Sequence, residues 1–160
     1  MAKTSSSDAA MVRFPPPLVF LITLVGGVLL HRLVLPWPLE LPPAARITGT
    51  VFLAAVAVGL HVAALSLFRG SRQDDPRPWK ETPTIVVTGI YRFSRNPMYV
   101  GMSFAQVACG LGMRNTWLVV LVPLALVTVF FTAIRPEEAY LERKFGDSYR
   151  EYKRSVRRWL

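Results

Sequence analysis

The sequence is short of charged residues and of cysteine, and both shortages limit the possible folds. Charged residues make up 18% of its 160 residues, against about 25% in soluble domains. The single cysteine, Cys109, can form no intrachain disulfide and no cysteine-rich metal site. Charged residues are absent from the 22 positions between Arg46 and Arg69 and from the 20 between Arg114 and Arg135. These shortages exclude a soluble globule, a disordered chain and a secreted disulfide scaffold.

Hydrophobic residues are abundant, at 52% of the chain, and they lie in long segments. A segment of about 20 apolar residues matches the thickness of a bilayer's hydrocarbon core. We expect spans at about 18–35, 47–68, 97–113 and 116–134. A cleaved signal peptide is the alternative for the first of these, but no small-residue cleavage site follows it, so we expect it to be retained. The predicted fold is all-α, an integral membrane protein with about four transmembrane helices.

Proline, glycine and asparagine predict where the later helices begin and end. Asn96 followed by Pro97 is a helix start, with Asn96 as the cap and Pro97 in the first helical position. A turn at 114–115 makes the last two spans an antiparallel hairpin. Pro136 restarts a helix that leaves the membrane, and Gly146 is a natural C-terminal cap. A second short amphipathic helix completes a tail that could lie on the membrane surface.

The distribution of basic residues predicts the orientation. The chain has 19 Lys and Arg against 10 Asp and Glu. Six basic residues fall in 69–96 and eight in the tail from Arg135, against one each in 36–46 and 114–115. The positive-inside rule therefore places the long loop and both termini in the cytoplasm, which is the cytoplasmic side of the inner membrane if the source is bacterial. We expect the basic residues to contact membrane lipids, and we expect no nucleic-acid partner.

The predicted hairpin brings ionisable residues to one membrane boundary. Arg92 and Arg95 precede the third span, and Glu137 and Glu138 follow the fourth. Charged groups at the end of a span tend to pair or to line a polar cavity. Each also has a simpler explanation, because the arginines can set topology and the glutamates can favour the helix dipole. We therefore treat residues 1–68 as a tail with two spans, and 69–160 as the part that forms a site.

Two motifs in the second half resemble a known family. GIYRFSRNPMYVG at 89–101 resembles the G-x-Y-R-x-x-R-[HN]-P-x-Y-x-G signature of the isoprenylcysteine carboxyl methyltransferases. The pattern E-E-x-x-L-x-x-x-F-G-x-x-Y-x-x-Y at 137–152 resembles their C-terminal signature. Phospholipid methyltransferases share a related Asn-Pro-Met-Tyr segment and a pair of glutamates. Asn96 stands where many isoprenylcysteine enzymes have histidine, and in this it resembles the phospholipid enzymes. The resemblance covers about half of the chain, and the first two spans carry no signature.

The resemblance implies an integral-membrane methyltransferase that uses S-adenosylmethionine, without a Rossmann domain and without a metal. Its cofactor would lie at the cytoplasmic end of the last spans, beneath the C-terminal segment. By motif, cofactor binding falls to Tyr91, Arg95, Asn96, Pro97, Tyr99, Gly101, Glu137 and Glu138. The residues expected to act in catalysis are Arg92, Arg95, Asn96 and Glu138.

The methyl acceptor is expected to be an amphiphile or a lipid that enters from the bilayer. A carboxylate acceptor, as in an isoprenylcysteine, needs no general base and could be held by Arg92 or Arg95. A lipid amine is the alternative, and it must first lose a proton, to which Glu137 or Glu138 could contribute. A non-catalytic membrane scaffold that keeps the motifs for folding is a further alternative.

Overall fold

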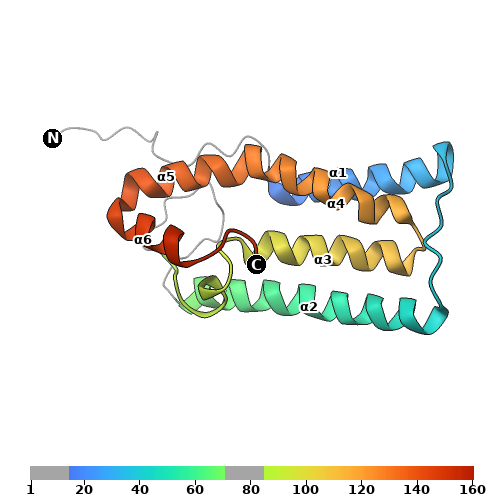
Figure 1. The fold of residues 1–160 in the computed structure, drawn as a ribbon, viewed down its shortest axis with the longest axis horizontal. Helices are drawn as coiled ribbons and strands as arrows, with labels where there is room; N and C mark the ends of the chain where they lie inside the picture. Colours follow the sequence, from blue (N-terminus) through green and yellow to red (C-terminus); the bar gives the residue numbers. More distant parts are fainter. Residues whose placement is uncertain (1–14, 71–84) are drawn as a thin grey trace.

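A computed structural model describes residues 15–70 and 85–160, and every regular element in these ranges is a helix (Figure 1). The described elements, in chain order, are α1 (Pro16–Leu29), the π-helical turn η1 (Leu30–Val34), α2 (Pro43–Gly70), the 3-10 turn η2 (Gly89–Arg92), α3 (Pro97–Gly112), α4 (Thr116–Val129), the π-helical turn η3 (Phe130–Ile134), α5 (Arg135–Phe145) and α6 (Asp147–Ser155). The all-α class is thereby confirmed. Most of the long loop expected at 69–96 lies outside the described residues.

Three of the described helices are long and apolar enough to cross a membrane: Pro16–Val34, Pro43–Leu67 and Thr116–Phe145. Charged residues begin only at Arg135 in the last of these. We therefore place the end of this candidate span at Ile134, with α5 beyond it. The 16 residues of α3 extend about 24 Å, less than the roughly 30 Å hydrocarbon core. The span expected at 97–113 therefore stays a prediction, as does the division of the chain at residue 68.

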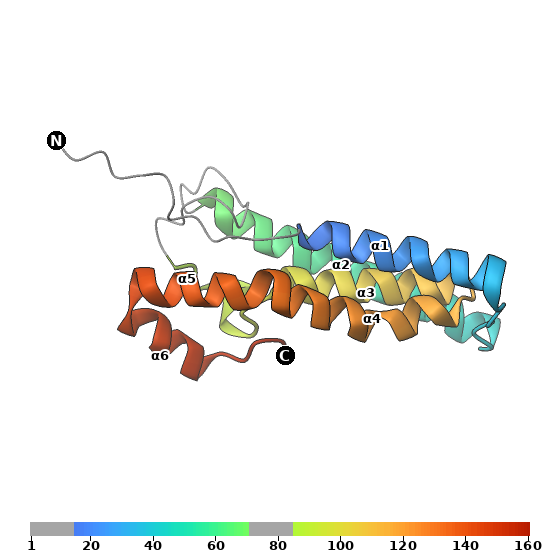
Figure 2. The same cartoon turned by 90° about the horizontal axis from the view of Figure 1, so that it is seen from above.

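The helices do not pack in chain order. The α1 helix packs against α4 and also touches α3, whereas α2 packs against α3 (Figures 1 and 2). The α3 helix, which is itself packed against α4, therefore lies in the middle of the bundle. Its N-terminal end faces the junction between α4 and α5, which is where the chemistry was expected.

Glycine permits the close contacts between these helices. A Cβ atom at Gly27 of α1 would lie 2.7 Å from Cδ2 of Leu118 in α4. A Cβ atom at Gly110 of α3 would lie 2.8 Å from Cγ2 of Val119. Small residues at such contacts let helix backbones approach in lipid, where the hydrophobic effect does not drive helices together.

One buried polar side chain joins three helices. Gln106 of α3 is 2% exposed. Its Oε1 accepts a hydrogen bond from Thr23 Oγ1 of α1 at 2.9 Å, and its Nε2 donates to the Leu118 carbonyl of α4 at 3.0 Å. Because no water is available there, both ends of this amide need a partner within the protein.

The turn between α3 and α4 confirms the predicted hairpin. Arg114 adopts a φ of 53°, and the Asn115 side chain caps α4 by accepting a hydrogen bond from the Trp117 backbone N–H at 3.0 Å. The same side chain donates to the Gly27 carbonyl at 3.0 Å, which ties α1 to the turn. The hairpin is therefore fixed at the end opposite the start of α3, where Arg95 and Glu138 lie.

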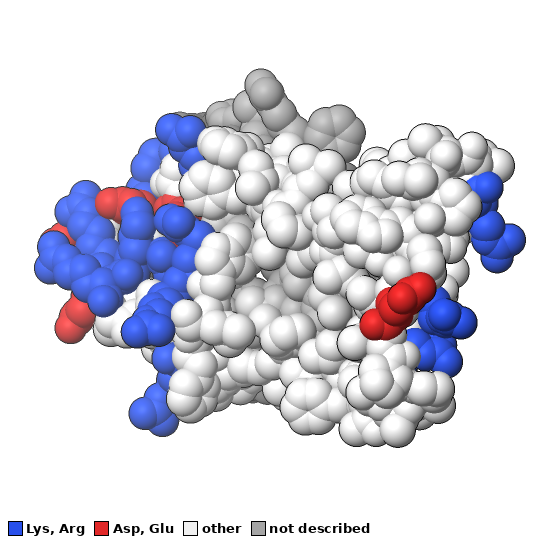
Figure 3. Space-filling model, turned by 45° about the vertical axis from the view of Figure 1, so that its right-hand side comes forward, with Lys and Arg blue, Asp and Glu red and all other residues white. Residues whose placement is uncertain are grey.

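Beyond the bundle, the chain folds back on itself. Gly146 ends α5 as predicted, with a φ of 56° that favours glycine. The α6 helix then turns back beside α5, and the last residues return toward the start of α3 (Figure 2). Figure 3 shows most of the visible basic side chains gathered at this end, next to a band without charge.

Candidate functional site

The site is built around the start of α3. The helix begins at Pro97 with Asn96 in the cap position, as predicted, but the Asn96 side chain makes no capping hydrogen bond. It donates instead from Nδ2 to the carbonyl of Arg158 at 3.1 Å. The Asn96 backbone N–H donates to Ser94 Oγ at 3.1 Å. The capping role is therefore wrong for this side chain, because the end of the chain supplies a competing acceptor.

The last five residues, 156–160, form a C-terminal segment that is bound to the loop before α3. The Arg95 backbone N–H donates to the Arg157 carbonyl at 3.0 Å. The Ser94 hydroxyl donates to the Arg158 carbonyl at 3.4 Å, beside the Asn96 contact. These bonds hold the C-terminal segment over the N-terminal end of α3.

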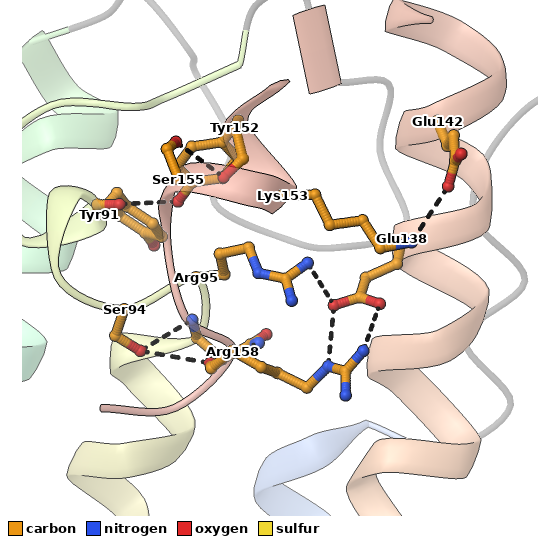
Figure 4. Close-up of polar contacts among 10 residues, drawn as sticks. Tyr91, Ser94, Arg95, Glu138, Glu142, Tyr152, Lys153, Ser155 and Arg158 are labelled. Atoms are coloured by element: carbon orange, nitrogen blue, oxygen red, sulfur yellow. Dashed lines mark hydrogen bonds and ion pairs between the residues drawn. The ribbon is translucent and has the colours of Figure 1, made fainter. Parts of the chain in front are cut away.

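Two arginines converge on one carboxylate (Figure 4). Arg95, from the loop before α3, places Nη1 2.9 Å from Oε1 of Glu138 in α5. Arg158, from the C-terminal segment, donates from Nε to Oε1 and from Nη2 to Oε2, each at 3.1 Å. The Arg158 guanidinium also lies 4.9 Å from the centre of the Phe130 ring. The fold thus brings together three charged side chains that lie far apart in the sequence.

The cluster is largely removed from solvent. The side chains of Arg95 and Glu138 are 9% and 12% exposed, and that of Arg158 is 33% exposed. Buried charges lose much hydration free energy and need close partners to compensate. Among the described residues, the buried Nε of Arg95 has no hydrogen-bond partner. The cluster therefore carries an excess of positive charge and an unused donor.

The helical turn that precedes α5 directs Glu138 toward the arginines. The Arg135 backbone N–H donates to the carbonyl of Phe130, five residues back, which makes η3 a π-helical turn. Pro136 follows immediately and has no N–H of its own to donate. Such wide turns are frequent at functional sites because they change the direction of the side chains that follow.

Glu137 lies beside the cluster, and its pKa is higher than that of an exposed glutamate. Burial, together with the negative charge of the neighbouring Glu138, raises the pKa of Glu137 to about 7. Burial also raises the pKa of Tyr91, and the charge of Glu137 adds to that rise. Burial raises the pKa of Tyr149 against the opposing charge of Arg95. Glu137 and these tyrosines therefore share one electrostatic environment.

The structure brings most of the predicted residues together. Arg95, Asn96 and Glu138 meet through the C-terminal segment, and Pro97 is buried at the start of α3. The remaining predicted site residues within or beside this region are Tyr91, Tyr99 and Glu137, of which Tyr99 is buried. That these residues bind a ligand stays a prediction.

Two predicted residues differ in their surroundings. Arg92 is exposed. Gly101 faces α2, where an added Cβ atom would lie 2.7 Å from Cε1 and from Nδ1 of His61. The glycine is thus needed for close packing of α3 on α2, and its assignment to cofactor binding also stays a prediction.

Sequence reasoning missed Arg158, which donates two of the hydrogen bonds to Glu138. Its neighbour Arg157 has the same side chain and is exposed. No spacing rule distinguishes the two, and the basic, aromatic tail was interpreted as a surface for lipid. Tyr152, on α6, donates from its hydroxyl to the Tyr91 carbonyl at 2.8 Å and so ties α6 to the loop before α3.

An apolar groove of about 370 Å³ adjoins the charged cluster. Its walls come from α2, from the loop before α3, from α3 itself and from the end of the chain. The groove is lined by Leu60, Ile90, Phe93, Ser94, Pro97, Val100 and Leu160. Because Ser94 also contacts the C-terminal segment, the groove and the polar cluster share a border.

Comparison with known proteins adds a family likeness. Residues 50–148 match the phospholipid methyltransferase family. An uncharacterized protein of Haemophilus influenzae is 43% identical over 65 residues, which is 39% of this chain and 100% of that protein. A protein-S-isoprenylcysteine O-methyltransferase of Schizosaccharomyces pombe is 38% identical over 72 residues, and one of Saccharomyces cerevisiae is 36% identical over 78 residues. The matched segments are 45% and 48% of this chain, but only 30% and 33% of those two relatives.

Proposed function

Because this chain belongs to the phospholipid methyltransferase family, we propose that it is an integral-membrane methyltransferase that transfers a methyl group from S-adenosylmethionine to the carboxylate of an isoprenylcysteine-like amphiphile. The observation that carries the proposal is the contact between Arg95 and Glu138, one from each signature motif, at 2.9 Å. If the two motifs served only to pack helices, they would not need to bury opposite charges beside an arginine N–H that has no partner among the described residues.

The charged cluster suits the cofactor chemically. S-adenosylmethionine carries a carboxylate, an ammonium group, a ribose diol and a sulfonium. The buried Nε–H of Arg95, which has no partner among residues 15–70 and 85–160, is a suitable donor to the carboxylate. Glu138 and Glu137 are suitable acceptors for the ammonium group or the diol. We assign Tyr91, Asn96, Pro97, Tyr99 and Gly101 to the surrounding pocket by motif.

When bound, the cofactor supplies a methyl group already activated by the positive charge on sulfur. The protein then has to align donor and acceptor and to exclude water. Arg95 and Glu138 are held by burial and by their ion pair, so they suit the task of alignment. The C-terminal segment covers the start of α3 and suits the exclusion of water. A carboxylate acceptor has no proton to lose, and we assign its binding to Arg92 or Arg95.

The apolar groove supports an amphiphilic acceptor. Its volume of about 370 Å³ and its lining by Leu60, Val100 and Phe93 suit a hydrocarbon chain. Its border at Ser94 would bring the head group of such a molecule to the charged cluster. We propose that the acceptor's hydrocarbon part occupies this groove and that its source is the bilayer.

We also propose that the charged end faces the cytoplasm. Eight of the 19 Lys and Arg residues lie at or after Arg135, and the basic side chains visible in Figure 3 gather mainly at that end. Positive residues beside spans are retained on the cytoplasmic side. The site would then be open to cytoplasmic S-adenosylmethionine.

A lipid amine is the second candidate acceptor, and Glu137 is the observation that favours it. An amine must lose a proton before it can accept a methyl group. A carboxylate whose pKa is about 7 can take up that proton near neutral pH. Asn96, in place of a titratable histidine, is also compatible with this acceptor.

The test is binding of S-adenosylhomocysteine, the reaction product, to purified protein in nanodiscs by calorimetry. We expect saturable binding near one per chain. Arg95→Ala should abolish binding while the protein still inserts, whereas Arg154→Ala, at an exposed position of α6, is the matched control. Transfer of a labelled methyl group to a prenylcysteine or to phosphatidylethanolamine then distinguishes the two acceptors. Absence of binding in a folded sample would contradict the proposal and favour a non-catalytic scaffold.

A further inference from the structure

Both oxygens of the Glu138 carboxylate contact arginine side chains of this chain. Its Oε1 contacts Arg95 Nη1 at 2.9 Å and Arg158 Nε at 3.1 Å, and its Oε2 accepts from Arg158 Nη2 at 3.1 Å. A bidentate pair between arginine and a carboxylate uses both oxygens in one plane. A cation brought by a ligand would therefore compete with the two arginines for this carboxylate.

The two arginines differ in how readily they can leave. The Arg95 side chain is 9% exposed, and that of Arg158 is 33% exposed. Arg158 belongs to the C-terminal segment, and part of its side chain already contacts solvent. Its charge would pass into water at little cost, whereas the charge of Arg95 would remain buried. Arg158 is therefore the exchangeable partner of Glu138.

We propose that Arg158 is an internal competitor for the cofactor: its guanidinium occupies Glu138 in the ligand-free protein and is displaced by the cofactor's ammonium group. The proposal rests on the function proposed above, and it assigns Arg158 a regulatory role that neither motif includes. Binding then replaces one cation at Glu138 by another, so the buried carboxylate is never left without a partner.

The displacement also affects the apolar groove. Leu160, two positions after Arg158, lines the groove. When Arg158 leaves Glu138, the C-terminal segment loses its two side-chain hydrogen bonds to that carboxylate, while Ser94, Arg95 and Asn96 still donate to its backbone carbonyls and Trp159 still packs against the core. The segment is then less firmly held, and Leu160 can leave the groove. Cofactor binding would thus prepare the groove for the acceptor.

The decisive measurement is the affinity for S-adenosylhomocysteine of the full chain in nanodiscs. Arg158→Gln removes the competing cation, and we expect this variant to bind about fivefold more tightly than the wild type. Arg158→Lys keeps a competing cation but loses the bidentate geometry, so we expect its affinity to lie between those of the wild type and of Arg158→Gln. Arg157→Gln, which changes the exposed neighbour and keeps its backbone carbonyl, should leave the affinity unchanged. Weaker binding by Arg158→Gln would show that Arg158 holds the cofactor, and it would overturn the proposal.

Motion of the C-terminal segment is the second measurement. A nitroxide label is attached at Leu160→Cys in a Cys109→Ser background, and its mobility is recorded by electron paramagnetic resonance. We expect S-adenosylhomocysteine to increase the mobility in otherwise wild-type protein, and Arg158→Gln to be mobile without it. A label that stays equally immobile in all samples would contradict release of the segment.

These results separate the two proposals. If wild-type protein binds no S-adenosylhomocysteine, the proposed function fails first. If wild-type protein binds it but Arg158→Gln does not bind more tightly, only the role of Arg158 fails.

Discussion

Gln106 and Arg95 are both buried beside or within α3, and they differ in how their hydrogen-bonding groups are used. Gln106, in the apolar part of the bundle, has partners at both ends of its amide, on α1 and on α4. Arg95, at the charged end, pairs with Glu138 and keeps a buried Nε that has no hydrogen-bond partner in the described part of the chain. The Gln106 amide is thus satisfied by neighbouring helices, although the buried Thr116 Oγ1 at the start of α4 also has no hydrogen-bond partner among the described residues.

The charged end is not satisfied in this way, and the difference has a physical meaning. A buried donor without a partner costs free energy, and folding alone gives no reason to retain it. Buried ion pairs are likewise often no more stabilising than apolar residues of the same shape. Stability alone therefore does not explain the residues of the charged end, which agrees with the binding role proposed above and can be tested against the apolar part by substitution.

The largest effect is expected at Glu138. Glu138→Gln removes the charge shared by the buried Arg95 and the partly exposed Arg158, and breaking a buried pair costs about 3–5 kcal/mol. We expect a clear drop in melting temperature, and a loss of S-adenosylhomocysteine affinity of about 100-fold or more. Glu142→Gln is the matched control, because Glu142 lies one turn later on α5 and its ion pairs with Arg150 and Lys153 are open to solvent. Equal losses in the two variants would contradict a special role for the buried cluster.

A smaller effect is expected from the pH dependence of stability. An exposed glutamate titrates near 4.5, whereas Glu137 in the folded protein titrates at about 7. The folded state therefore binds the extra proton between these values, and the free energy of unfolding falls as pH rises from about 4.5 to about 7. Glu137→Gln, which resembles the protonated acid, should flatten this part of the profile. Melting temperatures measured across this pH range test the prediction. If they fall with pH as steeply in Glu137→Gln as in the wild type, the assignment to Glu137 is wrong.

The smallest effect is expected in the apolar part, at the contact between α1 and α4. Gly27→Ala places a methyl group 2.7 Å from Cδ2 of the fully buried Leu118, and such overpacking costs about 1–3 kcal/mol. Gly26→Ala is the control, because nothing lies within 4 Å of its Cβ position, and alanine favours a helix by up to about 1 kcal/mol over glycine. We expect Gly27→Ala to melt at a lower temperature while its affinity for S-adenosylhomocysteine stays unchanged. Loss of affinity in Gly27→Ala would show that the two regions are coupled.

The sequence predicted the helices well and the contacts of the site less well. Pro97 and Gly146 mark helix ends that the structure confirms, because each acts through its own backbone. Pro136 instead follows a π-helical turn in a helix that runs without interruption from Thr116 to Phe145. The convergence of Arg95 with Glu138 also followed from the sequence, since the turn at 114–115 leaves the two motifs at one end of a hairpin.

The side chain of Asn96 shows why the remaining contacts could not be predicted. A capping asparagine is a local pattern, but here the Arg158 carbonyl replaces the helix N–H as its partner. That partner lies 62 residues away. Likewise, Gly101 belongs to a motif but faces His61 of α2, a contact that depends on helix packing.

The sequence by itself determined the all-α class, the helix ends and the concentration of charge at one end, because proline geometry, glycine conformation and hydropathy act locally along the chain. Only the tertiary structure decided that α1 packs on α4, and that Arg158 is the residue of the basic tail that hydrogen-bonds to Glu138. Eight basic residues lie at or after Arg135, and each has a charge that could pair with Glu138. The choice among them depends on distance and burial, which exist only after α6 has folded back along α5 and carried the end of the chain to α3.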